Sequence, residues 1–305
     1  METPDGDFFD VDTARTLHKK RGLVIMTHGL EASSASGLSV DMARSFLSRG
    51  FDVACVNFRG CGGEPNRLLA GYHLGFTEDL TFYLEKLRER GVTEEFPVYI
   101  SGFSLGANVA LKFLGELGVR AKDFNIRGAA VTGAPFDVSR HYLELEKPGV
   151  NTLVYTNSLL KSMKSKAKLQ YEARGGNVPF DYERVKTATK IATVEDAYVA
   201  PLFGFESNFD YYEKSSCGQF LRQIAVPTLV VNARDDPFFN PEVEPEKLEV
   251  NPVNYVRTEK GGHLGFLFQR DRGEWEGEEQ GSSWMPRELG RFLVHVDRCL
   301  FHDSV

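Results

Sequence analysis

The segment Gly102–Gly106 places a serine between two glycines in the pattern G-x-S-x-G. This pattern is typical of a nucleophile elbow, a sharp turn between a strand and a helix that exposes the serine hydroxyl. The apolar residues 97–101 predict a strand before it, and residues 105–117 predict a helix after it. The glycines allow a tight turn and close packing of the helix. The spacing therefore predicts that Ser104 is a nucleophile.

A serine nucleophile needs a base, and His263 has the most suitable context among the seven histidines. It lies in the glycine-rich segment 260–265, directly after the last predicted strand. In a parallel sheet, loops at that end face the nucleophile. His28 follows the first long strand and precedes Gly29, so we expect it to shape that loop.

A carboxylate must orient the imidazole and stabilise its charged form. Asp235 and Asp236 both follow a predicted strand. We favour Asp236, since His263 follows it by 27 positions, a spacing that allows one helix and one strand between them. Asp235 is the alternative, and its other expected use is a hydrogen bond to loop backbone. The order Ser104, Asp236, His263 is the one expected of α/β-hydrolases, and it differs from the chymotrypsin and subtilisin orders.

Two backbone N–H groups are candidates for stabilising a developing oxyanion. The N–H of Leu105 opens the predicted helix, where the helix dipole favours negative charge. The N–H of Leu30 lies in the loop after the first long strand and is the candidate second donor. The chain has no H-E-x-x-H cluster and no P-loop, and we expect neither a metal nor a cofactor.

The elements that position these residues alternate between strand and helix. Strands are expected at 23–27, 51–58, 97–101, 126–132, 227–232 and 253–256, with helices at 37–48, 75–90, 105–117 and 286–299. Nearly continuous apolar strands of this kind indicate a mostly parallel sheet with helices on both faces. The pattern turns irregular and mostly helical over 137–222. We therefore predict one α/β-hydrolase domain over 1–305 with a helical cap inserted at about 137–222.

The predicted cap holds two distinctive clusters. Its lysines predict a solvated helix face and are Lys161, Lys164, Lys166 and Lys168. Its aromatic residues are expected to pack within the cap, or alternatively to line an apolar site beneath it; they are Tyr198, Phe203, Phe205, Phe209, Tyr211 and Tyr212. Further along, the acidic, glycine-containing stretch 272–281 predicts an exposed loop.

Composition excludes several classes of protein. The chain has 305 residues, 42% of them hydrophobic, which is ordinary globular usage. A net charge of -7 argues against nucleic acid as a partner. Its apolar runs are too short to cross a bilayer, and no signal peptide opens it. The four cysteines have no paired spacing and there is no Asn-x-Ser/Thr sequon, so we expect a cytoplasmic location.

The chain resembles the YheT-like, or embryogenesis-associated-protein-like, branch of the α/β-hydrolases. The matching segments are 3–12, 28–33, 57–66, 102–108, 232–237 and 261–266, in family order. The resemblance places Ser104, Asp236 and His263 on the charge-relay positions. It implies a serine hydrolase acting on carboxylic esters, with relatives described as carboxylesterases, acylglycerol lipases or phospholipases. Some fungal relatives transfer acyl groups to alcohols.

The family's signature loop contains Arg59, Glu64 and His73, for which we hypothesise a buried ionic network that fixes the loop. Family members usually carry a longer segment before the motif at 4–8, and animal relatives have a membrane anchor there. The resemblance thus leaves room for a peripheral membrane contact.

The predicted function is hydrolysis of a lipid or acylglycerol-type ester through an acyl-enzyme, with a small-molecule ester as the partner. One alternative is an alcohol O-acyltransferase that uses the same triad. A second alternative, from another class, is a non-catalytic binding module on a hydrolase scaffold, because fold does not fix function.

Overall fold

The strands form one mostly parallel sheet. A computed structural model describes residues 1–69, 71–147, 155–243, 245, 252–266 and 284–301. The sheet order within these residues is β1-β3-β2-β4-β5-β6-β7, and only β1 is antiparallel to its neighbour. The strands are β1 (Val11–Ala14), β2 (Gly22–Thr27), β3 (Phe51–Val56), β4 (Val98–Phe103), β5 (Ile126–Thr132), β6 (Thr228–Ala233) and β7 (Val253–Thr258). The predicted mostly parallel sheet with helices on both faces is confirmed.

The central strands are apolar along their whole length because helices cover both faces of the sheet. All six residues of β2 and all six of β4 are buried. Val24 and Met26 belong to one hydrophobic cluster, whereas Leu23 and Ile25 belong to the other. This alternation follows from the pleat, which points successive side chains to opposite faces.

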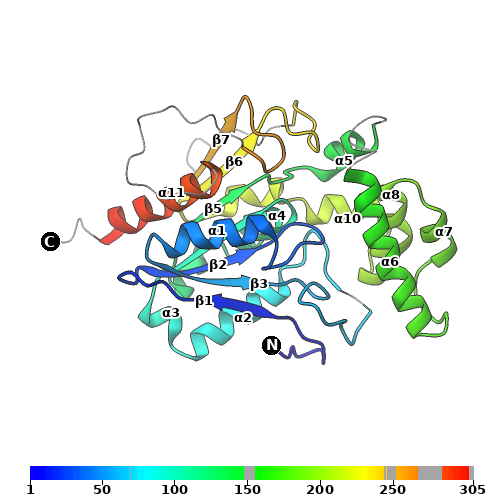
Figure 1. Cartoon of the computed structure of the whole chain (residues 1–305), viewed down its shortest axis with the longest axis horizontal. Coiled ribbons are helices and arrows are strands. Elements are labelled where there is room, and N and C mark those ends of the chain that lie inside the picture. Colours follow the sequence, from blue (N-terminus) through cyan, green and yellow to red (C-terminus); the bar gives the residue numbers. More distant parts are fainter. Residues whose placement is uncertain (70, 148–154, 244, 246–251, 267–283, 302–305) are drawn as a thin grey trace.

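Helices cover both faces of the sheet (Figure 1). On one face, α1 (Gly37–Leu47) and α11 (Trp284–Phe301) contribute Phe46 and Leu293 to the core. On the other, α2 (Glu78–Glu89) and α4 (Leu105–Leu117) contribute Leu84 and Leu111. The remaining short helices around the sheet are α3 (Val92–Glu95), η1 (Gly118–Phe124) and η4 (Cys217–Gln223).

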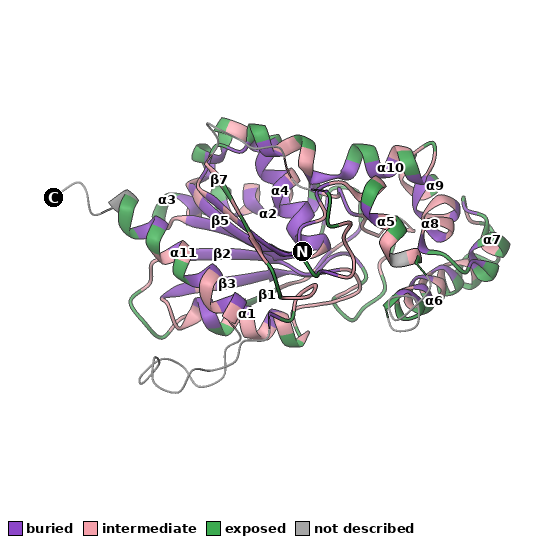
Figure 2. Ribbon diagram, turned by 90° about the horizontal axis from the view of Figure 1, so that it is seen from above, coloured by how far each residue is buried: buried purple, intermediate pink, exposed green. Residues whose placement is uncertain are grey.

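A group of helices lies between β5 and β6 in sequence and at one end of the sheet in space. Figures 1 and 2 both show α5 to α10 gathered there, beside the main body. The helices are α5 (Val138–Glu146), α6 (Asn157–Ala173), α7 (Tyr182–Thr187), α8 (Ile191–Val194), the π-helical turn η3 (Glu195–Val199), α9 (Ala200–Phe203) and α10 (Asn208–Ser215). After them, η4 packs against α4 of the main body. The predicted boundary at 222 therefore falls within a helix that belongs to the sheet's cover.

Some features differ from the expectations or go beyond them. The short edge strand β1 was not predicted, and its residues are half-buried or exposed. The helix expected over 75–90 begins only at Glu78. The stretch 272–281 lies outside the described residues. Within the described part of the chain, no helix combines the length and apolar character required to cross a membrane.

Candidate active site

Ser104 sits on a strained turn between β4 and α4. Its φ of 56° and ψ of -125° are unusual for a residue with a side chain. The flanking positions require glycine. A Cβ on Gly102 would lie 2.6 Å from the Thr27 hydroxyl, and a Cβ on Gly106 would lie 2.4 Å from the carbonyl oxygens of Thr27 and His28. The two glycines therefore let the elbow lie against the end of β2.

The structure brings Ser104, His263 and Asp236 into one hydrogen-bonded chain. The Ser104 Oγ lies 2.8 Å from Nε2 of His263, and Nδ1 of His263 lies 2.7 Å from a carboxylate oxygen of Asp236. The three residues follow the carboxyl ends of β4, β7 and β6, which meet at one edge of the sheet. Asp235 points elsewhere, because its carboxylate accepts the backbone N–H of Gly262 at 2.9 Å.

The imidazole of His263 is held from two further directions. Phe238 stacks on it with ring centroids 4.1 Å apart and an interplanar angle of 15°, and Phe239 meets it edge-on at 5.3 Å. Asp236 is buried, and its second oxygen accepts the Phe238 N–H at 2.8 Å. The same carboxylate thus orients the histidine and the aromatic ring that covers it.

The loop after β2 presents the second predicted oxyanion donor. Within the described residues, neither the N–H of Leu30 nor that of Leu105 donates a hydrogen bond. The loop is held by His28, whose Nε2 accepts the Phe58 N–H at 3.1 Å and whose Nδ1 donates to the Gly29 carbonyl at 2.8 Å. Burial lowers the pKa of His28 to about 4, so at neutral pH the ring is neutral and can accept at one nitrogen while it donates at the other.

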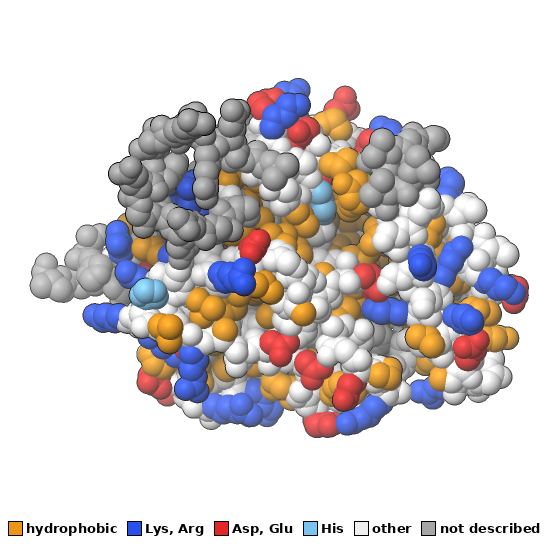
Figure 3. All heavy atoms as spheres, viewed as in Figure 1, with side chains coloured by type: hydrophobic (Ala, Val, Ile, Leu, Met, Phe, Trp, Pro, Cys, Tyr) orange, Lys and Arg blue, Asp and Glu red, His pale blue; other side chains and the backbone are white. Residues whose placement is uncertain are grey.

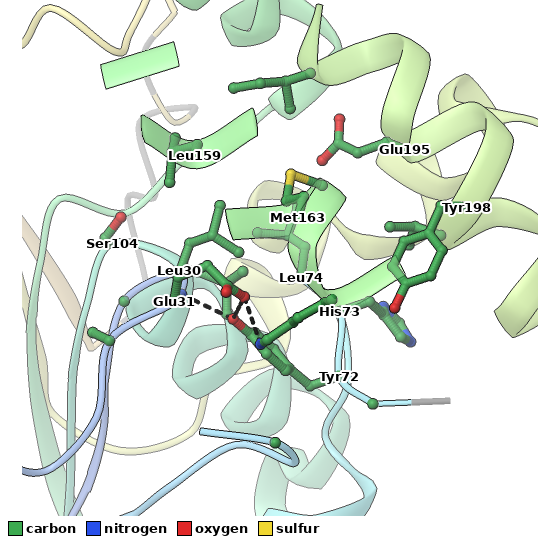
Figure 4. Close-up of a pocket in the computed structure, with 18 of the residues that line it drawn as sticks. Leu30, Glu31, Tyr72, His73, Leu74, Ser104, Leu159, Met163, Glu195 and Tyr198 are labelled. Atoms are coloured by element: carbon green, nitrogen blue, oxygen red, sulfur yellow. Dashed lines mark hydrogen bonds and ion pairs between the residues drawn. The ribbon is translucent and has the colours of Figure 1, made fainter. Parts of the chain in front are cut away.

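Glu31, which follows Leu30 in the same loop, connects this loop to the cap (Figure 4). Its φ is 56°, and its N–H donates to the Tyr72 hydroxyl at 2.9 Å. Its carboxylate accepts hydrogen bonds from Tyr72 at 2.9 Å, from Lys166 of α6 at 2.7 Å, and from Ser162. Burial opposes ionisation of Glu31, but these partners outweigh it and its pKa lies below the usual value. The prediction of a solvated face is therefore wrong for Lys166.

The hypothesised ionic network exists around Arg59 but has other partners. The Arg59 guanidinium donates twice to Asp79, at 2.9 and 2.7 Å, and once to Asp5 at 2.6 Å. Glu64 is exposed and forms no ion pair within the described residues, so its predicted role is wrong. His73 lies among aromatic rings instead, and burial lowers its pKa to about 3.

A cavity of about 910 Å³ opens between Ser104 and the helices at the end of the sheet. Figure 3 shows this face hollowed there and walled by hydrophobic side chains. Of the cap's aromatic residues, Tyr198, Phe203 and Tyr211 line the cavity, whereas Phe209 is half exposed. Aliphatic side chains line it too, from both the main body and α6 and α9: Leu30, Leu74, Leu159, Met163 and Leu202.

Sequence reasoning missed the residues that join the loop to the cap. Glu31 and Lys166 are 135 residues apart, and Glu31 and Ser162 are 131 apart. No spacing rule relates such positions. The only local signal was that Glu31 directly follows the predicted donor Leu30.

The fold and the elbow serine define an α/β-hydrolase. The model of the hydrolase family described as "Serine aminopeptidase, S33" matches residues 18–254, and the chain belongs to this family. The chain is 35% identical over 273 residues to the esterase-type protein YheT of Escherichia coli (strain K12), covering 88% of this chain and 77% of that protein. The predicted family is thereby confirmed, and it is one of esterase- and lipase-type serine hydrolases.

More distant relatives agree with this assignment. The Saccharomyces cerevisiae monoacylglycerol lipase is 26% identical over 308 residues, which cover 99% of this chain and 63% of that protein. The solved structure of Est1E from Butyrivibrio proteoclasticus, with ferulic acid bound, superposes with a TM-score of 0.55 at 12% identity. That alignment covers 96% of this chain and 97% of Est1E and shows the shared fold.

Proposed function

We propose that this protein hydrolyses carboxylic esters of lipids, of the acylglycerol type, through a covalent acyl-enzyme. The observation that carries the proposal is the hydrogen-bonded chain Ser104–His263–Asp236, with bonds of 2.8 and 2.7 Å, whose serine and histidine line a largely apolar cavity. A nucleophile within hydrogen-bond reach of an oriented base is the arrangement that acyl transfer requires.

In the proposed reaction, His263 takes the Ser104 proton while Oγ attacks the ester carbonyl carbon. The N–H groups of Leu30 and Leu105 hold the oxyanion, and Asp236 stabilises the imidazolium. His263 then protonates the departing alkoxide, leaving the acyl group on Ser104. A water molecule, deprotonated by His263, attacks this acyl-enzyme and releases the carboxylic acid. The steps use side chains and backbone alone.

The cap, taken as residues 137–222, is proposed to enclose the acyl chain. The apolar lining of the cavity supports this, because it would remove a hydrocarbon chain from water at roughly 25 cal/mol per Å² buried. Named relatives act on lipid esters, as the yeast monoacylglycerol lipase does. No nucleic acid partner is proposed, and a peripheral contact with a membrane would supply such substrates.

Transfer of the acyl group to an alcohol is the second candidate. A yeast relative, 25% identical over 299 residues, is named medium-chain fatty acid ethyl ester synthase/esterase 2, which combines both activities. Either acceptor attacks the same acyl-enzyme. Analysis of products formed with and without ethanol or glycerol separates them, since a transferase gives the new ester and a hydrolase the free acid.

The direct test of the proposal is Ser104→Ala assayed with p-nitrophenyl esters of increasing acyl length. The variant should fold as the wild type does and lose turnover, because the proposed nucleophile is removed. Retained turnover in a folded Ser104→Ala protein would refute the mechanism.

A further inference from the structure

The cavity is apolar in its middle and polar at its far end (Figure 4). In this view Ser104 lies at one side, and three polar side chains lie at the other: His73, Glu195 and Tyr198. Four aliphatic side chains lie between the two sides, namely Leu30, Leu74, Leu159 and Met163, and beside them lie Glu31 and Tyr72, which are bonded to each other. A linear acyl chain attached to Ser104 would therefore pass hydrocarbon and then meet polar atoms.

Glu195 opens the π-helical turn η3, and such turns are frequent at functional sites. Its side chain points toward Met163 and the cavity in Figure 4. The Tyr212 hydroxyl donates a hydrogen bond to one carboxylate oxygen of Glu195, Oε2. The other oxygen, Oε1, accepts no hydrogen bond from the described residues. Burial raises the pKa of Glu195 to about 7, so near neutral pH it can either accept or donate a hydrogen bond.

His73 is a second polar side chain in the lining of the cavity. Its Nδ1 accepts the Gly75 N–H at 3.1 Å, so in the neutral ring the proton resides on Nε2. The rings of Phe203 and Tyr211 surround the imidazole, with centroids 4.5 and 5.7 Å away. No acceptor for Nε2–H occurs within the described residues. The far end of the cavity thus offers a ligand one hydrogen-bond donor, the Nε2–H of His73, and one group that can donate or accept, the carboxyl of Glu195.

We propose that this end of the cavity is a polar subsite that binds a hydroxyl group on the acyl chain, so that the preferred substrates are esters of hydroxylated fatty acids. The inference rests on the proposed ester hydrolysis and deepens it. A methyl terminus would desolvate the carboxyl and the imidazole without giving them a partner, which is unfavourable. A hydroxyl both donates and accepts, and its chain remains apolar enough for the corridor.

The test compares matched esters. Each p-nitrophenyl alkanoate in a series of increasing length is paired with its terminal-hydroxy analogue, and kcat/KM is measured for both. At the length that reaches the subsite, the wild type should favour the hydroxylated ester about tenfold, the cost of leaving one buried polar group unpaired. A wild-type preference for the unsubstituted ester at every length would overturn the inference, whatever the variants do.

Variants assign the preference to Glu195. Glu195→Leu should abolish it and speed turnover of the unsubstituted ester, whereas Glu195→Gln, which keeps hydrogen-bonding atoms, should retain most of it. The matched control is Glu183→Gln. Glu183 is an exposed carboxylate of the cap that pairs with Lys186 at 3.3 Å and does not line the cavity, so the preference should not change. An undiminished preference in folded Glu195→Leu would refute the assignment.

A binding experiment separates this inference from the proposed function. Calorimetry on Ser104→Ala measures the affinity for alkanamides and for their terminal-hydroxy analogues, neither of which needs turnover. Tighter binding of the hydroxylated amide supports the subsite even if the protein proves not to hydrolyse esters. Equal binding, in a wild type that does hydrolyse esters, leaves the proposed function standing and overturns the subsite.

Discussion

The bond between Glu31 and Lys166 is expected to control turnover without touching the substrate's reacting atoms. Glu31 follows the proposed oxyanion donor Leu30 and has a φ of 56°. Such a backbone conformation costs on the order of 1–3 kcal/mol and persists only where contacts enforce it. The contact here is the carboxylate of Glu31, which is bonded to Lys166 of the cap at 2.7 Å. We expect Glu31→Gln and Lys166→Met to weaken the hold on the loop.

The magnitude follows from the exposure of the pair. The Glu31 side chain is 15% exposed and that of Lys166 is 31% exposed, so the bond is partly screened. A hydrogen bond to a charged group in such a setting contributes about 2 kcal/mol. If most of this loss shifts the loop away from its oxyanion-binding form, kcat falls roughly 10- to 30-fold. The fall should stay below the roughly 100- to 1,000-fold loss expected for deleting a whole donor.

The assay is steady-state hydrolysis of a short p-nitrophenyl ester, with kcat and KM separated. We expect kcat to fall and KM to change little, because in the proposed mechanism Glu31 positions a contact that is made only in the transition state. Lys168→Met is the matched control on the same helix, since Lys168 pairs with exposed Glu172 at 3.7 Å and forms no other ion pair among the residues that the structure describes. Wild-type kcat in both Glu31→Gln and Lys166→Met, or an equal fall in Lys168→Met, would refute the reasoning.

Three further outcomes are expected. Asp79→Asn should lower the free energy of unfolding by about 3 kcal/mol in urea, because it breaks a buried pair with Arg59, whereas Glu64→Gln should change it little; equal effects would contradict the network. Since the folded-state pKa of Glu195 is raised from 4.5 to about 7, its burial destabilises the ionised form, and this loss grows as pH rises from 4.5 through 7. The free energy of unfolding of Glu195→Gln should therefore exceed that of the wild type by up to about 3 kcal/mol at pH 8 and should equal it at pH 4.5. A difference in unfolding free energy that does not depend on pH would exclude this. Gly106→Ala places a Cβ 2.4 Å from the backbone of β2 and should lower both Tm and activity; normal values for both would show that the elbow can relax.

Much of the fold could be predicted because its signals are local. The alternation of short apolar strands with amphipathic segments gave β2 to β7 and the helices that cover them, and the glycines around Ser104 gave the elbow. The structure also brings His263 to Ser104 and Asp236 to His263, since parallel strands end at one edge of the sheet. The edge strand β1 was missed because four half-exposed residues carry no clear period.

An apolar site beneath the cap was one of the expectations, but the polar groups of the cavity could not be predicted, because they come from distant segments. The choice of Asp79 rather than Glu64 as the partner of Arg59 depends on where α2 packs against the signature loop. Lys166 differs from the neighbouring lysines only because the end of the sheet brings Glu31 beneath it. The sequence around Glu195 gives no sign that its side chain is buried, since that burial arises from packing among the cap helices.

The claim that Ser104 is an activated nucleophile is tested most directly by fluorophosphonate labelling, with the modified peptide located by mass spectrometry. We expect wild-type protein to be labelled on Ser104, Ser104→Ala not at all, and His263→Ala far more slowly, because its serine lacks the base. Labelling of another residue, or equal labelling of wild type and Ser104→Ala, would contradict the mechanism. Unlabelled wild type that is fully folded would favour a binding module on this scaffold.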